Sequence, residues 1–144
     1  MKDPHIDCEY NNVHYHLNIV GCFVYPQGYA AVTEYLHNMT GVNMVVDIGN
    51  GTANILQINN KKPIEEKCFT EKLGVNQYMI AVQKAVMAAY GKKIDPEVVE
   101  HFIRNGDTNV SDNYKNIFRE EAEKYCRKIF DALYRCEYDP DFMK

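Results

Sequence analysis

Apolar and polar positions follow two different periods along this 144-residue chain. In the first half, short apolar runs with partial alternation lie between turn residues. They predict strands over 14–25, 43–48, 53–59 and 64–69. In the second half, apolar residues recur at helical spacing over 75–90 and 111–134. Strands followed by long amphipathic helices predict an α/β domain in which both helices pack against a central sheet.

Proline, glycine and capping residues set the limits of these elements. Pro26 stops the first strand and favours a helix over 27–39, which Thr40 and Gly41 end. Asp95 as N-cap and Pro96 at the first helical position predict a further helix that ends at Asn105-Gly106. Gly91 closes the 75–90 helix, a turn over 59–62 joins two strands, and Ser111 or Asp112 caps the last helix.

These limits divide the chain into a polar N-terminal segment over 1–12, a main segment over 13–135 and a tail over 136–144. The N-terminal segment is expected to be frayed or loosely docked. The apolar stripe of the last helix is interpreted as core packing, not as a cofactor site. Glu100 and Arg104 lie one helical turn apart and are interpreted as a surface ion pair.

The most informative stretch is Val45-Val46-Asp47-Ile48-Gly49-Asn50-Gly51-Thr52. A strand delivers a carboxylate into a turn whose glycines leave the backbone bare, so that N–H groups can approach an anion. A carboxylate beside bound phosphates can hold Mg²⁺ or orient an attacking water. An Asn-Gly dipeptide is also a strong hairpin signal by itself. The string alone therefore fits either a phosphate site or a plain hairpin.

Asp-Ile-Gly-x-Gly-Thr resembles the second phosphate-binding motif of the actin-like ATPase superfamily, which includes actin, sugar kinases and DnaK-type chaperones. Three further segments look like the ParM/StbA plasmid-segregation branch of that superfamily: 24–31 before the motif, and 72–76 and 103–106 after it. The resemblance covers roughly 17–133. It implies a ribonuclease H-like half-domain of the actin-like ATPase fold, with a three-stranded glycine-hairpin sheet and packed helices.

The resemblance also implies roles for individual residues. Asp47 would act on the Mg²⁺-bound or attacking water, and Gln27 would face that water or make local hydrogen bonds at a helix start. Gly74 would open the helix near the nucleotide. Donors to the β- and γ-phosphates of ATP or GTP would come from Gly49, Asn50, Gly51 and Thr52. Asn54 stands where many relatives carry an Asp, a departure that weakens metal handling.

A complete clamp of this kind also needs a first phosphate hairpin and a Gly-rich adenosine loop, and neither is found in these residues. We therefore expect an incomplete, C-terminal-half segment whose parent binds nucleotide and Mg²⁺, hydrolyses ATP and polymerises to segregate plasmid DNA. The segment alone is expected to bind weakly and to be inactive. One alternative is a non-enzymatic module that caps or regulates filaments. Another is a ribonuclease H-type nuclease, which needs several carboxylates where only Asp47 is available.

Composition narrows the partners. A net charge of −4 and a pI near 5.7 disfavour direct binding along nucleic acid, so contact with DNA is expected only through an adaptor protein. Self-association is expected, as filaments in the parent and as dimers or small oligomers here. No apolar run reaches the length of a membrane span, and we expect a cytoplasmic protein.

Cysteine and histidine spacing gives no framework for disulfides or zinc. The five cysteines are scattered and contain no Cys-x-x-Cys, so reduced, partly buried thiols are expected. His14 and His16 fall on one side of a presumed strand, with His5 and Cys8 as the nearby candidates for further ligands. Because this spacing fits no familiar zinc pattern, the two histidines are interpreted as exposed strand residues.

Overall fold

A computed structural model of the chain describes residues 5–139 and 141. In chain order it contains strands β1 (His5–Tyr10) and β2 (Val13–Asn18), a 3₁₀ helix η1 (Ala30–Asn38), strands β3 (Val42–Ile48), β4 (Ala53–Asn59) and β5 (Lys62–Glu71), and helices α1 (Val75–Tyr90), α2 (Pro96–Asn105) and α3 (Asp112–Arg135). The predicted α/β class is confirmed. The first four residues and part of the predicted tail, residues 140 and 142–144, lie outside the described residues.

The central sheet is antiparallel and has the order β3-β4-β5. Its two hairpins are the ones that the turn residues predict. Gly49 to Thr52 join β3 to β4, and Asn60 and Lys61 join β4 to β5 with positive φ angles of 45° and 70°. Two successive residues of positive φ match the right-handed twist of the flanking strands. The third strand is longer than the predicted 64–69, because pairing with β4 extends it at both ends.

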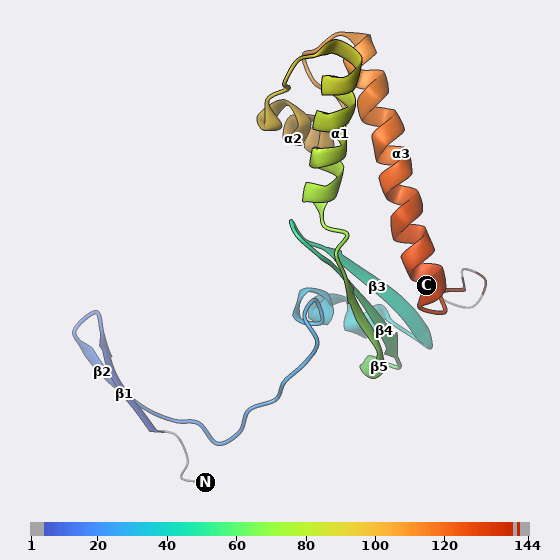
Figure 1. Cartoon of the computed structure of the whole chain (residues 1–144). Coiled ribbons are helices and arrows are strands. Elements are labelled where there is room, and N and C mark those ends of the chain that lie inside the picture. The colour runs from blue at the N-terminus through green and yellow to red at the C-terminus, as the bar shows by residue number, and fades with distance from the viewer. Residues whose placement is uncertain (1–4, 140, 142–144) are drawn as a thin grey trace.

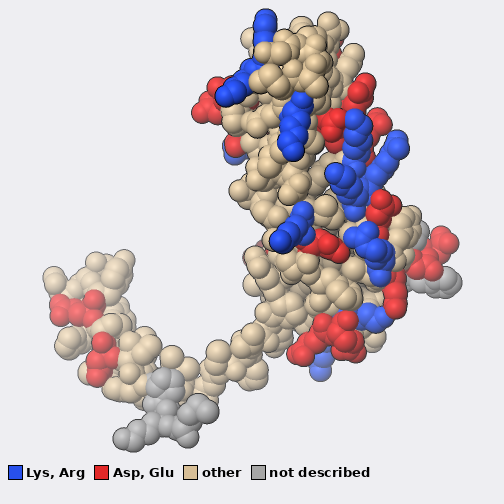
Figure 2. Space-filling view, in the orientation of Figure 1, with Lys and Arg blue, Asp and Glu red and all other residues tan. Residues whose placement is uncertain are grey.

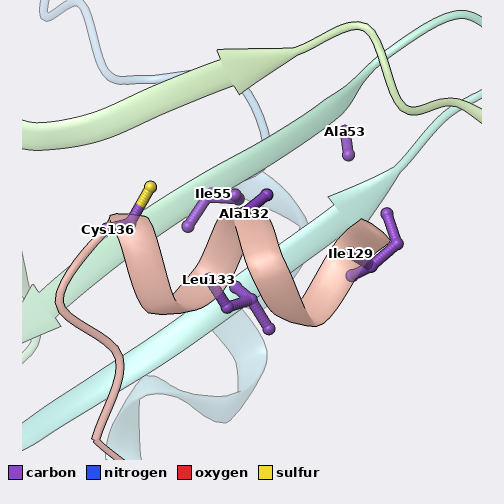
Figure 3. Packing of buried hydrophobic residues seen from close by; sticks show 6 residues of the cluster. All are labelled: Ala53, Ile55, Ile129, Ala132, Leu133 and Cys136. Atoms are coloured by element: carbon purple, nitrogen blue, oxygen red, sulfur yellow. The ribbon is translucent and has the colours of Figure 1, made fainter. Parts of the chain in front are cut away.

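Helix α3 covers one face of this sheet with its C-terminal half. Ala53 and Ile55 of β4 pack against Ile129, Ala132 and Leu133, and all five are buried (Figure 3). Two ion pairs flank this contact: Arg135 reaches Glu71 at 3.3 Å, and Lys67 pairs with Glu137. The predicted role of the α3 stripe in core packing is confirmed, and Ser111 takes the N-cap position without a side-chain capping bond.

A second core lies among the helices. Tyr78, Val82 and Val86 of α1 pack with residues of α2 and with Phe118 of α3. The prediction that α1 packs against the sheet is therefore wrong. Helix α1 leads away from the end of the sheet, and its apolar stripe is buried by α2 and α3 (Figure 1). Tyr125 joins the two cores, because it packs against both clusters and its hydroxyl donates to the Leu73 carbonyl at 2.6 Å.

The N-terminal part differs most from the predictions. His5–Tyr10 is not frayed but forms β1, which pairs with β2 around a turn at Asn11 and Asn12. The strand predicted over 14–25 ends at Asn18 and does not join the central sheet. An extended segment over 19–26 connects this hairpin to the remainder of the molecule (Figure 1). The helix predicted over 27–39 is only the 3₁₀ helix Ala30–Asn38.

Candidate functional site

The glycine turn between β3 and β4 lies directly against the N-terminus of α1. Three N–H groups at the start of that helix donate to three successive carbonyls of the turn. The bonds join Gly74 to Gly51 at 3.3 Å, Val75 to Gly49 at 3.0 Å and Asn76 to Asn50 at 2.9 Å. These N–H groups have no partner within the helix, so the turn acts as its cap. The bonds fix the turn relative to α1.

Gly74 is where the two backbones come closest. A Cβ atom built there would lie 2.3 Å from the Asn50 carbonyl oxygen and 2.4 Å from the Gly51 carbonyl carbon. Its φ of −71° and ψ of 166° suit any residue, so this glycine is required by the close approach and not by its conformation. The prediction that Gly74 opens the helix beside the motif agrees with this position.

Because its carbonyls face α1, the turn keeps most of its N–H groups for other partners. Gly49 donates to the Thr52 carbonyl at 2.9 Å, which closes the turn. In the described part of the chain, the N–H groups of Asn50, Gly51 and Thr52 have no backbone acceptor. Gly49, Asn50 and Gly51 are exposed, and Thr52 is half-buried. Successive unbonded N–H groups in a turn are suited to anion binding, and this turn lies at the N-terminus of α1, the positive end of the helix dipole.

Asp47 lies two residues before the turn, on the face of the sheet opposite α3. Its direct partner across the hairpin is Asn54, a buried residue whose Oδ1 accepts a hydrogen bond from Thr70 at 2.9 Å. The segment before η1 covers the same face. A Cβ atom at Gly28, where φ is +89°, would lie 3.1 Å from the Asp47 Cβ and 3.3 Å from its Oδ2. Asp47 therefore stands between the glycine turn and this segment.

Gln27 lies beside the same residues. Together with Asn54 and Thr70 it lines a cavity of about 190 Å³ between the segment before η1 and β4–β5. Gln27 is exposed and precedes η1. The fold thus brings two regions that are 20 positions apart in the chain, around Gln27 and around Asp47, to the same face of the sheet.

A second cleft lies on the other side of the turn. It measures about 280 Å³ and is lined by Gly49 and Asn50 of the turn, by the start of α1, and by Glu100 and Arg104 of α2. The Arg104 guanidinium lies 3.6 Å from the Glu100 carboxylate, and both are exposed, so the predicted ion pair is confirmed. This pair also borders the cleft beside the turn, which its spacing on a helix could not reveal.

The single carboxylate of Asp47 fits a magnesium ion whose other ligands are water and substrate phosphates. Asp47 belongs to no group of three close His, Cys, Asp or Glu side chains within the described residues. Mg²⁺ is commonly held by one or two carboxylates together with water and substrate phosphates, and one carboxylate is present here. A two-metal nuclease site needs several converging carboxylates, so this arrangement disfavours the nuclease alternative.

Sequence reasoning missed two contributors to the site. Thr70 donates a hydrogen bond to the Asn54 amide oxygen. The register of the predicted hairpin, which places Thr70 opposite Asn54, could have revealed this contact. Tyr125 ties the segment before α1 to α3 through the Leu73 carbonyl. No local pattern could have found that contact, because 52 positions separate the two residues.

Fold and turn together define a C-terminal half of an actin-like ATPase fold. A profile of the family described as archaeal actin homologue MreB-like, C-terminal, matches residues 45–138, well over half of the chain. The chain belongs to this family. The match begins within the strand that leads to Asp47 and includes the glycine turn and all three α-helices.

Solved structures agree on the fold. The archaeal actin homologue Ta0583 in complex with ADP superposes with a TM-score of 0.65 at 16% identity, over 99% of this chain and 50% of that one. The apo ParM protein of pSK41 gives 0.54 at 18% identity, over 72% and 27% of the two chains. ParM of Bacillus thuringiensis with ATP gives 0.51 at 16%, over 68% and 32%.

These similarities have limits of coverage and identity. The chain spans at most about half the length of these structures. Among curated proteins, no sequence matches this chain. Among the described residues, none of the helices combines the length and apolar character that a membrane span requires.

Proposed function

We propose that this chain carries the second phosphate-binding element of a ParM-type, actin-like ATPase. The observation that carries the proposal is the orientation of the glycine turn. Its carbonyls cap α1, and its N–H groups at Asn50, Gly51 and Thr52 remain available on an exposed surface. An anion as compact and as charged as a nucleotide phosphate suits such a turn at the positive end of a helix. ADP bound to an archaeal actin homologue supports this choice of ligand.

In this proposal the residues around the turn have separate roles in binding phosphates and Mg²⁺. Backbone N–H groups of Asn50 to Thr52 and the Thr52 hydroxyl donate to the β- and γ-phosphates of ATP or GTP. Gly49 closes the turn through its own N–H. Asp47 would hold the water shell of a bound Mg²⁺ or orient an attacking water, and the ion would neutralise charge on the phosphates. Gln27 contributes from the neighbouring segment, and Gly74 provides the close approach that positions the turn.

Affinity is expected to be low for these 144 residues by themselves. The turn contacts one side of a triphosphate, whereas tight binding requires enclosure and preorganised contacts on several sides. ATP should therefore bind no tighter than in the high micromolar range, without measurable turnover. In a protein that also supplies the opposing phosphate hairpin and an adenosine loop, the same residues would serve hydrolysis and polymerisation. DNA segregation would then proceed through an adaptor protein.

The test is a titration of the ¹⁵N-labelled chain with ATP and Mg²⁺, followed by amide chemical shifts. Shifts should concentrate on residues 49–52 and on the start of α1. Gly51→Ala should reduce them because its methyl group occupies the surface beside the free N–H groups. Tight binding by calorimetry, or steady phosphate release that Asp47→Ala abolishes, would contradict the weak-binding proposal. Shifts that avoid the turn would contradict the site itself.

A second candidate function, a non-enzymatic module that associates with other copies or caps a filament, is favoured by one observation. The apolar face of the β1–β2 hairpin is exposed, with relative accessibilities from 41% to 68% at Ile6, Tyr10, Val13, Tyr15 and Leu17. Exposed strand edges with apolar faces pair readily with other chains. We therefore expect dimers or small oligomers, and no regular filaments. A strict monomer by sedimentation equilibrium, or ordered filaments in electron micrographs, would contradict this expectation.

A further inference from the structure

The β1–β2 hairpin has a second face whose chemistry is unrelated to the nucleotide proposal. Alternation and register place six polar side chains on it in three directly opposed pairs. The pairs are His5 with Asn18, Asp7 with His16, and Glu9 with His14. We call these six residues the polar face of the hairpin. Cys8, which is paired with Tyr15, belongs to the opposite, apolar face by the same alternation.

Three of these side chains converge. Ligand atoms of His5, Asp7 and His16 lie within 4.8 Å of one another. The His5 Nε2 is 3.1 Å from the Asp7 Oδ2, and the His16 Nδ1 contacts the Asp7 Oδ1. All three side chains are more than half exposed to solvent. Two imidazoles thus face the two oxygens of one carboxylate.

A neighbouring hydrogen bond orients one of the imidazoles. The His5 Nδ1 lies 2.7 Å from the Asn18 Oδ1, and an imidazole nitrogen that meets an amide oxygen must donate its proton. A neutral ring then carries only a lone pair at Nε2. In the neutral ring, that lone pair faces the Asp7 Oδ2 at 3.1 Å, so a cation can be held between two acceptors. A protonated ring would instead form an ion pair with Asp7, so the cation takes the place of a proton.

The charge around the hairpin favours a cation from solution. No Lys or Arg occurs between His5 and Asn60. In the view of Figure 2, basic side chains gather over the helices and the central sheet, whereas the hairpin shows only acidic charges. No ammonium or guanidinium of this segment therefore competes for the Asp7 carboxylate.

We propose that His5, Asp7 and His16 form a site for a divalent transition-metal ion of the zinc class. Two imidazoles and one carboxylate are a familiar protein ligand set for zinc, with a remaining position for water or another ligand. Metal–ligand bonds of about 2.0–2.2 Å require the three atoms, now within 4.8 Å of one another, to draw closer, which exposed side chains can do. Metal-binding histidines usually donate a hydrogen bond from the ring nitrogen that does not bind the metal, and the His5 contact with Asn18 is such a bond.

An ion bound at this site would stabilise the pairing of β1 with β2. Two ligands come from β1 and one from β2, so a bound ion connects the strands across the hairpin. A two-stranded hairpin without further strands is only marginally stable in water. An ion that binds the paired strands and not the separated ones stabilises the pairing. The site would therefore make the order of the N-terminal hairpin depend on metal.

Calorimetric titration of the whole 144-residue chain with Zn²⁺, in the absence of nucleotide, tests the proposal. We expect one site of micromolar or tighter affinity, and slower amide hydrogen exchange in β1 and β2 when Zn²⁺ is present. His5→Ala, Asp7→Asn and His16→Ala should each abolish both effects. Asn18→Ala should weaken binding about 10- to 100-fold, as other losses of a ligand-orienting partner do.

Three control variants test the choice of ligands. His14→Ala removes a histidine of the same face, Cys8→Ser removes a thiol of the opposite face, and His37→Ala removes a histidine of η1. All three should bind Zn²⁺ as the parent chain does. Absence of Zn²⁺ binding, binding that survives loss of all three proposed ligands, or binding lost in Cys8→Ser or His14→Ala would overturn the assignment. Mg²⁺ should not bind here because it prefers oxygen ligands.

Discussion

Gly74→Ala should destabilise the chain by separating the glycine turn from α1. An added Cβ would lie 2.4 Å and 2.5 Å from the carbonyl carbons of Gly51 and Asn50, whereas carbon atoms pack at about 3.5–4.0 Å. The two backbones must therefore move apart by about 1 Å. That displacement stretches the three turn-to-helix hydrogen bonds, now 2.9–3.3 Å, beyond useful length.

The expected loss follows from those bonds. Each contributes about 1 kcal/mol net, so losing three costs about 3 kcal/mol. Replacing glycine with alanine also stabilises by about 0.4–1 kcal/mol through the unfolded state, which leaves a net loss of about 2 kcal/mol or more. For a domain of this size the melting temperature should fall by about 5–10 °C.

Gly51→Ala is the matched control in the same turn. A Cβ atom at Gly51 meets nothing within 4 Å. The free energy of unfolding of this variant should therefore equal that of the parent or exceed it by up to about 1 kcal/mol. Urea unfolding followed by circular dichroism compares the two variants. If Gly74→Ala proves as stable as Gly51→Ala, the close approach does not hold the turn. The ATP titration tests the turn separately, because Gly51→Ala changes the phosphate surface in a fold that is at least as stable as that of the parent.

Three further predictions concern the core, an ion pair and a thiol. Phe118→Ala should lower the free energy of unfolding by about 3–5 kcal/mol because the ring is fully buried. Phe130→Ala, at an exposed position of the same helix, should change it by about 0.5 kcal/mol or less. Equal effects of the two variants in thermal melts would contradict the helical core. The Lys115 ammonium, 2.6 Å from Asp107, and a backbone N–H hold the pKa of that carboxyl below its usual range. The pair therefore stabilises the fold above the ordinary carboxyl pKa and loses this effect as pH falls through the lowered value, so Asp107→Asn should narrow the stability difference between neutral and strongly acidic pH. Burial raises the pKa of the Cys136 thiol, so iodoacetamide should label it more slowly than the exposed cysteines. Equal rates by mass spectrometry would contradict its burial in the core between the end of α3 and the sheet.

Local rules allowed the sequence to predict most elements of the second half. Asp95 caps α2 by accepting from the Glu97 N–H at 2.9 Å, and Gly91 and Gly106 take the left-handed conformation that ends α1 and α2. The Asp47 turn was predicted as a hairpin because the glycines and flanking apolar runs are contiguous. Each of these features depends on a few neighbouring residues, so a single sequence contains its whole cause.

Cysteine exposure shows where local reasoning stops. Cys136 is buried and Cys68 half-buried, but Cys8, Cys22 and Cys126 are exposed, so the expected partial burial fails for these three. Likewise α1 has the apolar stripe of a helix on a sheet, yet α2 and α3 cover it. An apolar stripe on a helix predicts that this face is buried, but it does not identify the element that buries it.

What only the tertiary structure decided is which distant residues share a surface. Pairing of β1 with β2 brings His5 and Asp7 to His16, although the spacing of the histidines matched no known ligand pattern. The segment around Gly28 meets Asp47, and the carbonyls of the glycine turn face α1. The sequence determined the turn, its carboxylate and the helix that follows. Their relative orientation depends on backbone contacts and strand register across the fold, and neither composition nor spacing encodes these locally.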